Sequence, residues 1–379
     1  MKYLIALILS IFFLGCGSMP SGLDGSLPTL DSGSERNGDS PQQAVQPTDA
    51  VVFTSTDVAV YRLPSIVRLL DGRIMVFAEK RDAIPDNSHA DIVYKVVGTD
   101  GEVSAEMTFP QSSTRIHSNP QPIVLPNGEI LLFYNNRKAN TSGPELCRRE
   151  ADLKRYAMKA SQADLHFTLY KPKWSVNNTG PQLISPTQGY WVPHPDSAQG
   201  RIYAPTFFLG NETDCKARTH RLDRAQIMVS RDMGESFTAD AVGQNINGTN
   251  ETSITFDPDF YLGHIYQHSR YYGDEVFHRL VTITSPGFVS DQITEAAPLV
   301  HGGSTMLNGA VYFSYPNATT RKNLVVMNKD TGVMVNVTNG PAGYSNMIPV
   351  DGFIAVVYET GEKDPLAYEE IRLKYLGAF

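Results

Sequence analysis

Apolar and polar residues alternate over short stretches of the chain after residue 50, and these stretches come in pairs separated by a turn that ends in glycine. The clearest case is LLDGRIMVFAEKR, residues 69–81. Alternation with a period of two is typical of a half-buried strand, and Asp-Gly or Asn-Gly between two such runs favours a hairpin because both residues tolerate a positive φ. Each copy therefore predicts a β-hairpin. The turn glycines are Gly72, Gly128, Gly200, Gly263, Gly309 and Gly352.

The hairpins recur at a fairly even interval. Successive turn glycines lie roughly 45 to 70 residues apart, which suits one four-stranded blade per hairpin. Six such units predict an all-β fold, a six-bladed β-propeller with four-stranded antiparallel blades. A β-sandwich has similar strands, but even repetition over about 330 residues favours the propeller.

One segment does not follow the strand pattern. Residues 144–162, PELCRREADLKRYAMKASQ, are compatible with one short helix or with a long connection between strands. They lie inside a long polar stretch from Asn135 to Trp174.

A second repeat is a turn with the pattern S-x-D-x-G-x-x-F, found as SRDMGESF at residues 230–237. The aspartate can accept hydrogen bonds from the backbone of its own turn, the glycine can take the strained position, and the aromatic ring can pack under the blade. This pattern is that of an Asp-box, which is a folding device and not a catalytic one. Residues 96–103 and 327–334 look like degraded copies.

The amino terminus predicts export. An early lysine, an apolar run and Gly15-Cys16 make residues 1–15 a signal peptide, because the run is too short for a spanning helix. The LGC ending resembles a bacterial lipobox, which implies a lipid on Cys16; the alternative is an ordinary signal peptide with an incidental cysteine. Residues 16–50 are rich in Ser, Gly, Pro and Asp and predict a flexible tether before a propeller domain over residues 51–379. The expected location is a cell-envelope lipoprotein at the outer membrane or cell surface, or otherwise a periplasmic or secreted protein.

Composition narrows the possible partners. The 379 residues are 41% hydrophobic and carry a net charge of -8, so the overall field does not attract nucleic acid or an anionic membrane. Membrane contact is expected only through the lipid anchor. Cys147 and Cys215 lie in polar sequence, where a disulfide and two free thiols are both possible. No metal-binding or phosphate-binding motif occurs, so the sequence predicts no metal and no cofactor.

The motif YRLP at residues 61–64, together with the turn at residues 230–237, resembles the sialidases (exo-α-neuraminidases), whose starting motif is [FY]-R-[IL]-P. The resemblance extends from about residue 53 to the C-terminus, but the polar stretch from Asn135 to Trp174 has no evident counterpart in a minimal sialidase. The resemblance therefore implies that this stretch is an insertion that reshapes one wall of the pocket. In this family arginines from three blades hold the carboxylate of the substrate, and guanidinium groups suit that task because their planar fork fits a carboxylate. The resemblance assigns this role to Arg62, Arg270 and Arg321.

The resemblance also implies a nucleophile pair. Glu251 in GTNETS and Tyr344 in PAGYSNM match the family's glutamate and tyrosine, in which the glutamate takes the hydroxyl proton. A neutral phenol suits an anomeric carbon that carries its own carboxylate, because an anionic nucleophile would be repelled. An ordinary tyrosine pKa lies near ~10, so Tyr344 needs a base and a positive field to react near neutrality.

Three aspartates in RDAIPDNSHADIVY compete for the acid/base role. The resemblance places the family's loop aspartate at Asp86, by counting forward five residues from Arg81 and back from the following strand DIVY. Asp82 would lie too close to Arg81, and Asp91 begins a strand. A general acid must hold its proton above the ordinary carboxyl pKa of about 3.9, so we expect Asp86 in a partly desolvated loop, away from the field of Arg81. Arg81 itself is implied to contact the 4-hydroxyl of the sugar ring.

Glu359 in VVYETG matches the carboxylate that orients the first arginine of the triad, and it would join the last blade to the first. Further residues are expected to line the pocket, although the sequence does not place them. The candidates are Asn135, Arg137, Tyr203 and Trp191.

Together these implications describe an exo-α-sialidase that hydrolyses terminal sialic acids from glycoproteins, glycolipids or oligosaccharides, with retention through a sialyl-tyrosine intermediate. A trans-sialidase or intramolecular trans-sialidase would use the same residues. A surface lectin that binds sialic acid without turnover is a further alternative. The sequence defines neither linkage preference nor oligomeric state.

Overall fold

The chain divides into two units, Met1–Val45 and Gln46–Phe379, and a computed structural model describes residues of the second unit only. The predicted signal peptide and tether, with Cys16, Cys147, Cys215 and Gly263, therefore lie outside the described residues. The described residues are 49–109, 114–138, 154–175, 182–194, 197–209, 223–239, 246–256, 264–271, 277–284, 288–296, 298, 300–362 and 369–379.

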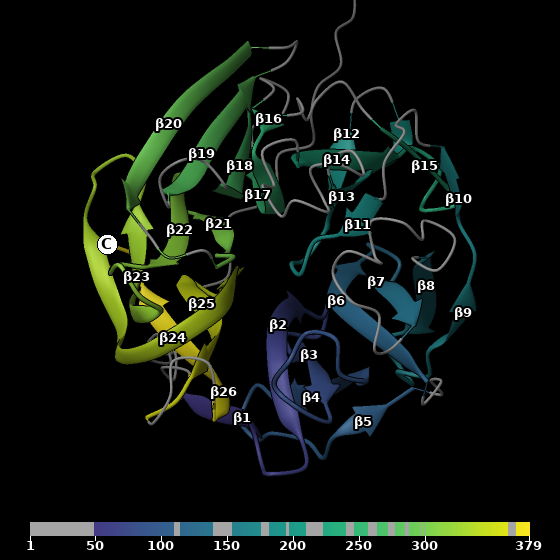
Figure 1. Cartoon of the computed structure of the whole chain (residues 1–379). Helices are drawn as coiled ribbons and strands as arrows, with labels where there is room; N and C mark the ends of the chain where they lie inside the picture. Colours follow the sequence, from purple (N-terminus) through teal and green to yellow (C-terminus); the bar gives the residue numbers. More distant parts are fainter. Residues whose placement is uncertain are drawn as a thin grey trace, which may run out of the picture. The chain divides into compact units, whose positions relative to one another are not determined.

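The described part of the second unit consists of strands, turns and irregular segments, and none of its residues is helical. The strands form six successive antiparallel blades (Figure 1). Inner strands of neighbouring blades contact one another, and the last blade contacts the first. This confirms the predicted all-β propeller. No helix that could span a membrane occurs in the ranges given above.

The first two blades follow one plan, in which four consecutive strands pair in order from the inside outwards. Blade 1 consists of β2 (Val60–Arg68), β3 (Ile74–Arg81), β4 (Ala90–Val97) and β5 (Met107–Thr108). Blade 2 consists of β6 (Arg115–Val124), β7 (Glu129–Lys138), β8 (Lys154–Ser161) and β9 (Thr168–Tyr170).

Blade 3 is less regular, because β10 joins β15 in parallel while β12 and β16 add short edges. Its strands are β10 (Lys173–Ser175), β11 (Gln182–Ile184), β12 (Tyr190–His194), β13 (Ser197–Phe208), β14 (Arg224–Ser230), β15 (Ser236–Ala239) and β16 (Ile246–Asn247). Blade 4 consists of β17 (Thr249–Phe256), β18 (His264–Tyr271), β19 (Phe277–Thr284) and β20 (Phe288–Ala296).

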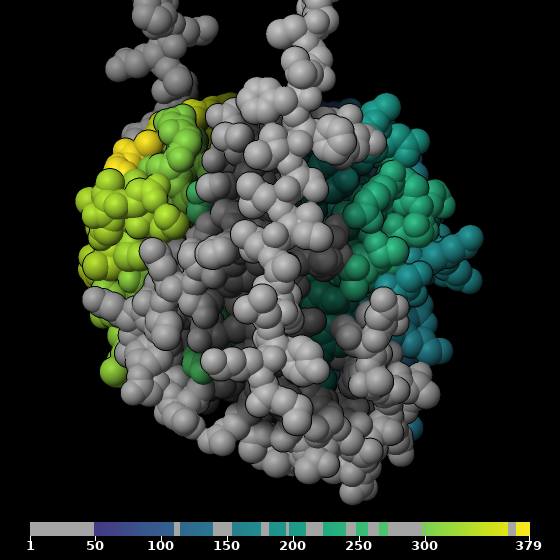
Figure 2. All heavy atoms as spheres, turned by 90° about the horizontal axis from the view of Figure 1, so that it is seen from above, coloured from purple at the N-terminus to yellow at the C-terminus, as the bar shows by residue number. Residues whose placement is uncertain are grey.

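Blades 5 and 6 share one long strand, β24 (Met334–Val350), whose first half pairs with β23 and whose second half pairs with β25. Blade 6 is closed by the earliest described strand, β1, which pairs with the last strand, β26. Figure 2 shows residues of these last blades in yellow-green on the side opposite the teal residues of blades 2 and 3. The other strands are β1 (Ala50–Thr54), β21 (Ser304–Leu307), β22 (Ala310–Pro316), β23 (Lys322–Asn328), β25 (Phe353–Thr360) and β26 (Glu370–Gly377).

The hydrophobic core lies between the facing sheets of neighbouring blades. Phe53, Val76 and Val357 belong to one buried cluster between blades 6 and 1, and Phe77 and Leu132 belong to another between blades 1 and 2. Apolar side chains on alternate positions of each strand therefore fill the space between successive sheets, as in stacked β-sheets generally. This packing fixes the strand ends that carry the polar residues described below.

Two predicted turns have the expected backbone. Asn308 and Gly309 have φ values of 52° and 78°, and Asp351 and Gly352 have φ values of 46° and 85°. Both residues of each two-residue turn therefore lie in the left-handed region, which matches the right-handed twist of the strands that they connect.

Three local expectations are wrong. Gly200 lies inside β13, where the ring of Trp191 covers it, and not at the tip of its hairpin. Residues 154–161 of the segment 144–162 form strand β8 and neither a helix nor a connection. The stretch from Asn135 to Trp174 likewise carries β8 and β9, which are regular strands of blade 2. The sequence did not predict these strands because polar residues on their exposed face hide the alternation of apolar and polar positions.

The turn at residues 230–237 is held by its own side chains. Asp232 accepts hydrogen bonds from the Ser236 amide at 2.8 Å and the Ser236 hydroxyl at 2.5 Å. Phe237 is fully buried and stacks on Trp174 with ring centroids 4.6 Å apart. These contacts join β14 to β15, which is a structural role.

Candidate active site

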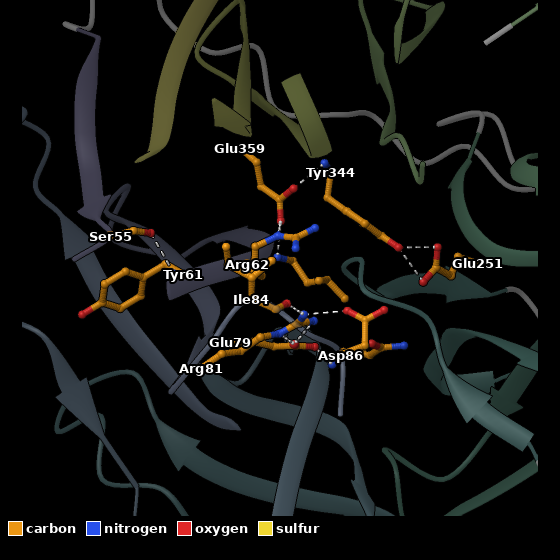
Figure 3. A network of polar contacts seen from close by, with 12 residues as sticks. Ser55, Tyr61, Arg62, Glu79, Arg81, Ile84, Asp86, Glu251, Tyr344 and Glu359 are labelled. Carbon is orange, nitrogen blue, oxygen red and sulfur yellow. Dashed lines mark hydrogen bonds and ion pairs between the residues drawn. The ribbon is translucent and has the colours of Figure 1, made fainter. Parts of the chain in front are cut away.

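The candidate residues come from four blades. Figure 3 shows Arg62, Arg81, Asp86, Glu251, Tyr344 and Glu359 near one another. Most of the candidates stand at or near the end of a strand, whereas Tyr344 lies inside β24, close to the point where this strand changes partner from β23 to β25. Their elements are β2 for Arg62, β3 for Arg81, the loop from β3 to β4 for Asp86, β17 for Glu251, β18 for Arg270, the residue before β23 for Arg321, β24 for Tyr344 and β25 for Glu359.

Tyr344 and Glu251 form a close pair. The Tyr344 hydroxyl lies 3.0 Å from each carboxylate oxygen of Glu251, to which it donates, and it accepts from Nη1 of Arg270 at 3.1 Å. Arg270 Nη1 also lies 2.7 Å from Oε2 of Glu251. The phenol hydroxyl therefore has a base and a cation side by side, in contact with each other and with it, and a base beside a hydroxyl is an arrangement that can activate it as a nucleophile.

Burial raises the pKa of Tyr344 well above its ordinary value, and the charge of Glu251 raises it further. Arg270 and Arg321 act in the opposite direction. Tyr344 is therefore protonated in the free protein, and the Glu251 carboxylate is the acceptor that its hydroxyl proton faces.

The three candidate arginines surround Tyr344 in different ways. Arg270 contacts its hydroxyl, and the guanidinium carbon of Arg321 lies 5.9 Å from the centre of its ring. Arg62 is linked to it through Glu359, which accepts from Nε of Arg62 at 2.8 Å and from the Tyr344 amide at 3.0 Å. The structure thus places Arg270 and Arg321 beside the Tyr344 side chain, and connects Arg62 to the Tyr344 main chain through Glu359.

Glu359 is a buried junction between blades 6 and 1. It is 0% exposed and also accepts from the Leu63 amide at 2.7 Å. Leu63 has a φ of 50° at an irregularity in the pairing of β2 and β3, so its amide turns out of the ladder toward the carboxylate. A non-glycine residue with this backbone is strained, and such strain concentrates at functional sites.

Arg81 is held by a second buried carboxylate that the sequence did not single out. Glu79 is 0% exposed, and its Oε2 lies 2.8 Å from Nε and 2.6 Å from Nη2 of Arg81. Its Oε1 accepts from the Asn119 amide in blade 2 at 2.8 Å. The sequence did offer one signal for Glu79. It is an ionisable residue two positions after Phe77 in β3, so it lies on the same face of the strand as that apolar residue.

Asp86 corrects an expectation. Its side chain is 85% exposed, and Oδ1 lies 2.6 Å from Nη1 of Arg81. Desolvation raises the pKa of Asp86, but the charge and hydrogen bond of Arg81, then the charges of Arg62 and Arg137, hold it below its ordinary value. The expected separation from Arg81 is wrong, because the loop turns back on itself with the Ser88 amide donating to the Pro85 carbonyl at 3.0 Å.

Of the four further pocket candidates, Arg137 contacts this set. Its Nη2 donates to the main-chain oxygen of Asp86. Asn135 is buried and bonds the main chain of Ile184, while Tyr203 packs in the core against Phe256. Trp191 donates from Nε1 to the Gln199 carbonyl at 2.9 Å.

Behind Tyr344 lies a buried histidine that the sequence did not indicate. The ring of His301 is 6.3 Å from that of Tyr344, and its main-chain oxygen accepts from Ser345 at 3.3 Å. Burial lowers the pKa of His301 to about 3, with His268 and Arg270 adding to the effect, so the ring is neutral. Within the described ranges, no group of three or more His, Cys, Asp or Glu side chains is placed to hold a metal ion.

Comparison with known proteins gives a fold. No protein-family model matches the chain, and no curated protein matches it in sequence. Among solved structures, it is similar to the Hadza microbial sialidase Hz136 (TM-score 0.67, 14% identity, 84% of this chain and 66% of that chain). It is also similar to the Trypanosoma rangeli sialidase (TM-score 0.63, 15% identity, 87% and 60%) and to a protein of unknown function from Dyadobacter fermentans (TM-score 0.66, 13% identity, 87% and 98%).

The chain thus spans less than two thirds of the length of these two sialidases. At such low identity the similarity establishes the fold, which is a β-propeller of the sialidase type. The T. rangeli enzyme has been solved with sialic acid, with the inhibitor DANA, and with 2,3-difluorosialic acid as a covalent intermediate.

Proposed function

We propose that the chain is an exo-α-sialidase that removes terminal sialic acids from glycoproteins, glycolipids or oligosaccharides with retention of configuration. The observation that carries the proposal is the Tyr344 hydroxyl, held 3.0 Å from both oxygens of Glu251 and 3.1 Å from Arg270. A tyrosine paired with a carboxylate among arginines suits an acidic sugar, and sialidases are the glycosidases in which tyrosine replaces the usual carboxylate nucleophile.

The proposed first step uses residues on both sides of the substrate. Arg62, Arg270 and Arg321 bind the sialic acid carboxylate. The Tyr344 oxygen bonds to the anomeric carbon and gives its proton to Glu251. Asp86 protonates the glycosidic oxygen as that bond breaks, which releases the aglycone as an alcohol and leaves sialyl-tyrosine.

The second step reverses these proton transfers. Asp86, now ionised, takes a proton from water, whose oxygen bonds to the anomeric carbon. Tyr344 leaves and recovers its proton from Glu251. Arg81 supports both steps by holding Asp86, and among the described contacts one Nη2 hydrogen of Arg81 has no acceptor, which suits a ring hydroxyl.

The direct test is hydrolysis of 4-methylumbelliferyl sialic acid by the purified chain, followed by fluorescence and by proton NMR of the sugar. We expect fluorophore release, with the α-anomer of free sialic acid appearing first because two inversions give retention. First appearance of the β-anomer would rule out the covalent intermediate. A folded protein that binds sialic acid without releasing fluorophore would be a lectin, and sialic acid found on an added acceptor would indicate a trans-sialidase.

The role of Asp86 predicts a dependence on the leaving group. We expect Asp86→Ala to lower kcat/KM for α2,3-sialyllactose by about 10²- to 10⁴-fold, the range for a lost general acid, because a sugar alkoxide needs a proton to leave. The loss for 4-methylumbelliferyl sialic acid should be less than about tenfold, since that phenol leaves without help. Equal losses on both substrates would contradict the role.

The same residue predicts the pH profile. Because the ion pair with Arg81 holds the pKa of Asp86 low in the free protein, kcat/KM should rise as pH falls toward that pKa. A bound carboxylate neutralises part of the arginine field, so the corresponding limb of kcat should lie at higher pH. Initial rates across pH check this, and both limbs should vanish in Asp86→Ala.

A further inference from the structure

The end of blade 2 beside the Asp86 loop carries a concentration of basic side chains. Five come from three adjacent strands. The register places Arg115 opposite Lys138 on one face of the sheet, with Lys154 on the same face, and sets Arg137 and Arg155 together on the other face. Like charges on directly opposite positions of a sheet repel one another. The protein as a whole is acidic, with a net charge of -8, so this is a local feature. The five residues, which we call the blade 2 basic end, are Arg115, Arg137, Lys138, Lys154 and Arg155.

Arg155 combines partial burial with little compensation of its charge. Among the described contacts its guanidinium donates from Nη1 to the Gln182 side chain and lies 5.1 Å from the ring of Trp174, while Nε is buried without an acceptor. No carboxylate in the described ranges pairs with it, and burial lowers its pKa to about 10. Burying an arginine without a counterion costs free energy. An anion that binds such an arginine removes part of this cost, so its binding free energy is more favourable than at a fully solvated arginine.

Arg137 connects this basic end to the proposed acid. It is half-buried, and its guanidinium donates to the main-chain oxygen of Asp86 and not to a carboxylate. Burial lowers the pKa of Arg137, and the nearby charges of Glu79 and Asp86 only partly oppose this. The blade 2 basic end therefore begins directly behind the residue that would protonate the leaving group.

The reaction geometry sets which part of a substrate meets this surface. A nucleophile and a leaving group occupy opposite faces of the carbon at which one displaces the other. With Tyr344 on one side, the glycosidic oxygen must lie on the Asp86 side, within hydrogen-bonding reach of that carboxyl. The sugar beyond this oxygen then extends over the Asp86 loop toward Arg137 and Arg155.

We propose that the blade 2 basic end is a subsite for a second acidic group, carried by the sugar next to the terminal sialic acid. The preferred substrates would be sialosides with an acidic aglycone, in which the second group is the carboxylate of another sialic acid or a sulfate ester. This inference rests on the proposed function, because it uses Tyr344 and Asp86 to orient the substrate. Arginine suits both groups, since its fork can donate two parallel bonds to a carboxylate or to an oxyanion of similar geometry.

The test compares matched substrates on the full chain. α2,3-Sialyllactose is compared with the same trisaccharide carrying a sulfate on galactose, and separately with an α2,8-linked sialic acid dimer. We expect kcat/KM to be about tenfold higher for at least one acidic aglycone, as for one charge-assisted contact, and the preferred compound identifies the source of the charge. The preference should shrink when salt is raised from about 0.05 M to about 0.5 M, because ions screen the contact.

Variants test the residues. Arg155→Gln and Arg137→Gln should each lower the ratio of kcat/KM between acidic and neutral aglycones about fivefold or more, while Arg372→Gln, on the outer strand β26 and paired with Glu370, should leave the ratio unchanged. A wild type without preference, or variants that lose activity equally on both substrates, would overturn the proposal. If nothing is hydrolysed, the proposed function fails, and calorimetric binding of the same intact compounds still decides whether a second acid is preferred.

Discussion

Replacing Tyr344 by phenylalanine is expected to lower kcat for sialoside hydrolysis by about three orders of magnitude or more, because the variant has no oxygen to form the covalent intermediate. The fold should survive, since the ring remains buried beside Leu63 and Glu251 keeps its 2.7 Å ion pair with Arg270. Steady-state rates measure the loss. Intact-protein mass spectrometry after 2,3-difluorosialic acid treatment should show an adduct on the wild type, located at Tyr344, and none on the variant.

A matched control separates the loss of the nucleophile from the loss of a buried hydroxyl. Tyr312 is buried in blade 5, and its hydroxyl donates to the Phe379 carbonyl at 3.2 Å. Tyr312→Phe should lower stability by about 1 kcal/mol, as for one hydrogen bond, with little change in kcat. An adduct on another residue, or full activity in Tyr344→Phe, would remove Tyr344 from the mechanism.

The fold could be predicted because hairpin signals are local. The pairs Asn308-Gly309 and Asp351-Gly352 stand at two-residue turns with positive φ, as their residue types require. The long strand β24 shows where a local signal fails. Asn339 and Gly340 are a residue pair typical of tight turns, yet the strand continues there and then changes partner from β23 to β25, which the packing of two neighbouring blades determines.

The sequence could predict which residues form the site, but it could predict less well which charges lie beside one another. Arg62 and Glu359 form an ion pair although they lie 297 residues apart in the sequence. The sequence motifs could suggest this pair because the last blade of a propeller packs against the first. The charge state of Asp86 could not be predicted by counting positions, because it depends on how the loop folds back onto Arg81. Glu79 was missed since a single glutamate in an alternating strand does not show whether its partner is water or a buried arginine.

Glu359→Gln is expected to lower the free energy of unfolding by about 3 kcal/mol and to weaken substrate binding. The carboxylate accepts from three donors, namely Arg62 Nε and the amides of Leu63 and Tyr344. A glutamine must turn its NH₂ group toward one of these donors, and Arg62, whose side chain is 7% exposed, then lacks its counterion in the interior. Breaking one side of a buried ion pair typically costs about 3 to 5 kcal/mol.

The matched control for this effect is Glu370→Gln on the outer strand β26, whose partner Arg372 is 46% exposed. An exposed pair of this kind contributes about 0 to 1 kcal/mol, so chemical denaturation should separate the two variants clearly. KM should rise only in Glu359→Gln, because Glu359 holds both an arginine of the proposed carboxylate site and the amide of the proposed nucleophile. Equal losses of stability, or an unchanged KM, would contradict this role of Glu359. The packing of the buried cluster that includes Phe53 and Val357 would then be sufficient to join blade 6 to blade 1, and Arg62 would keep its position without the Glu359 carboxylate.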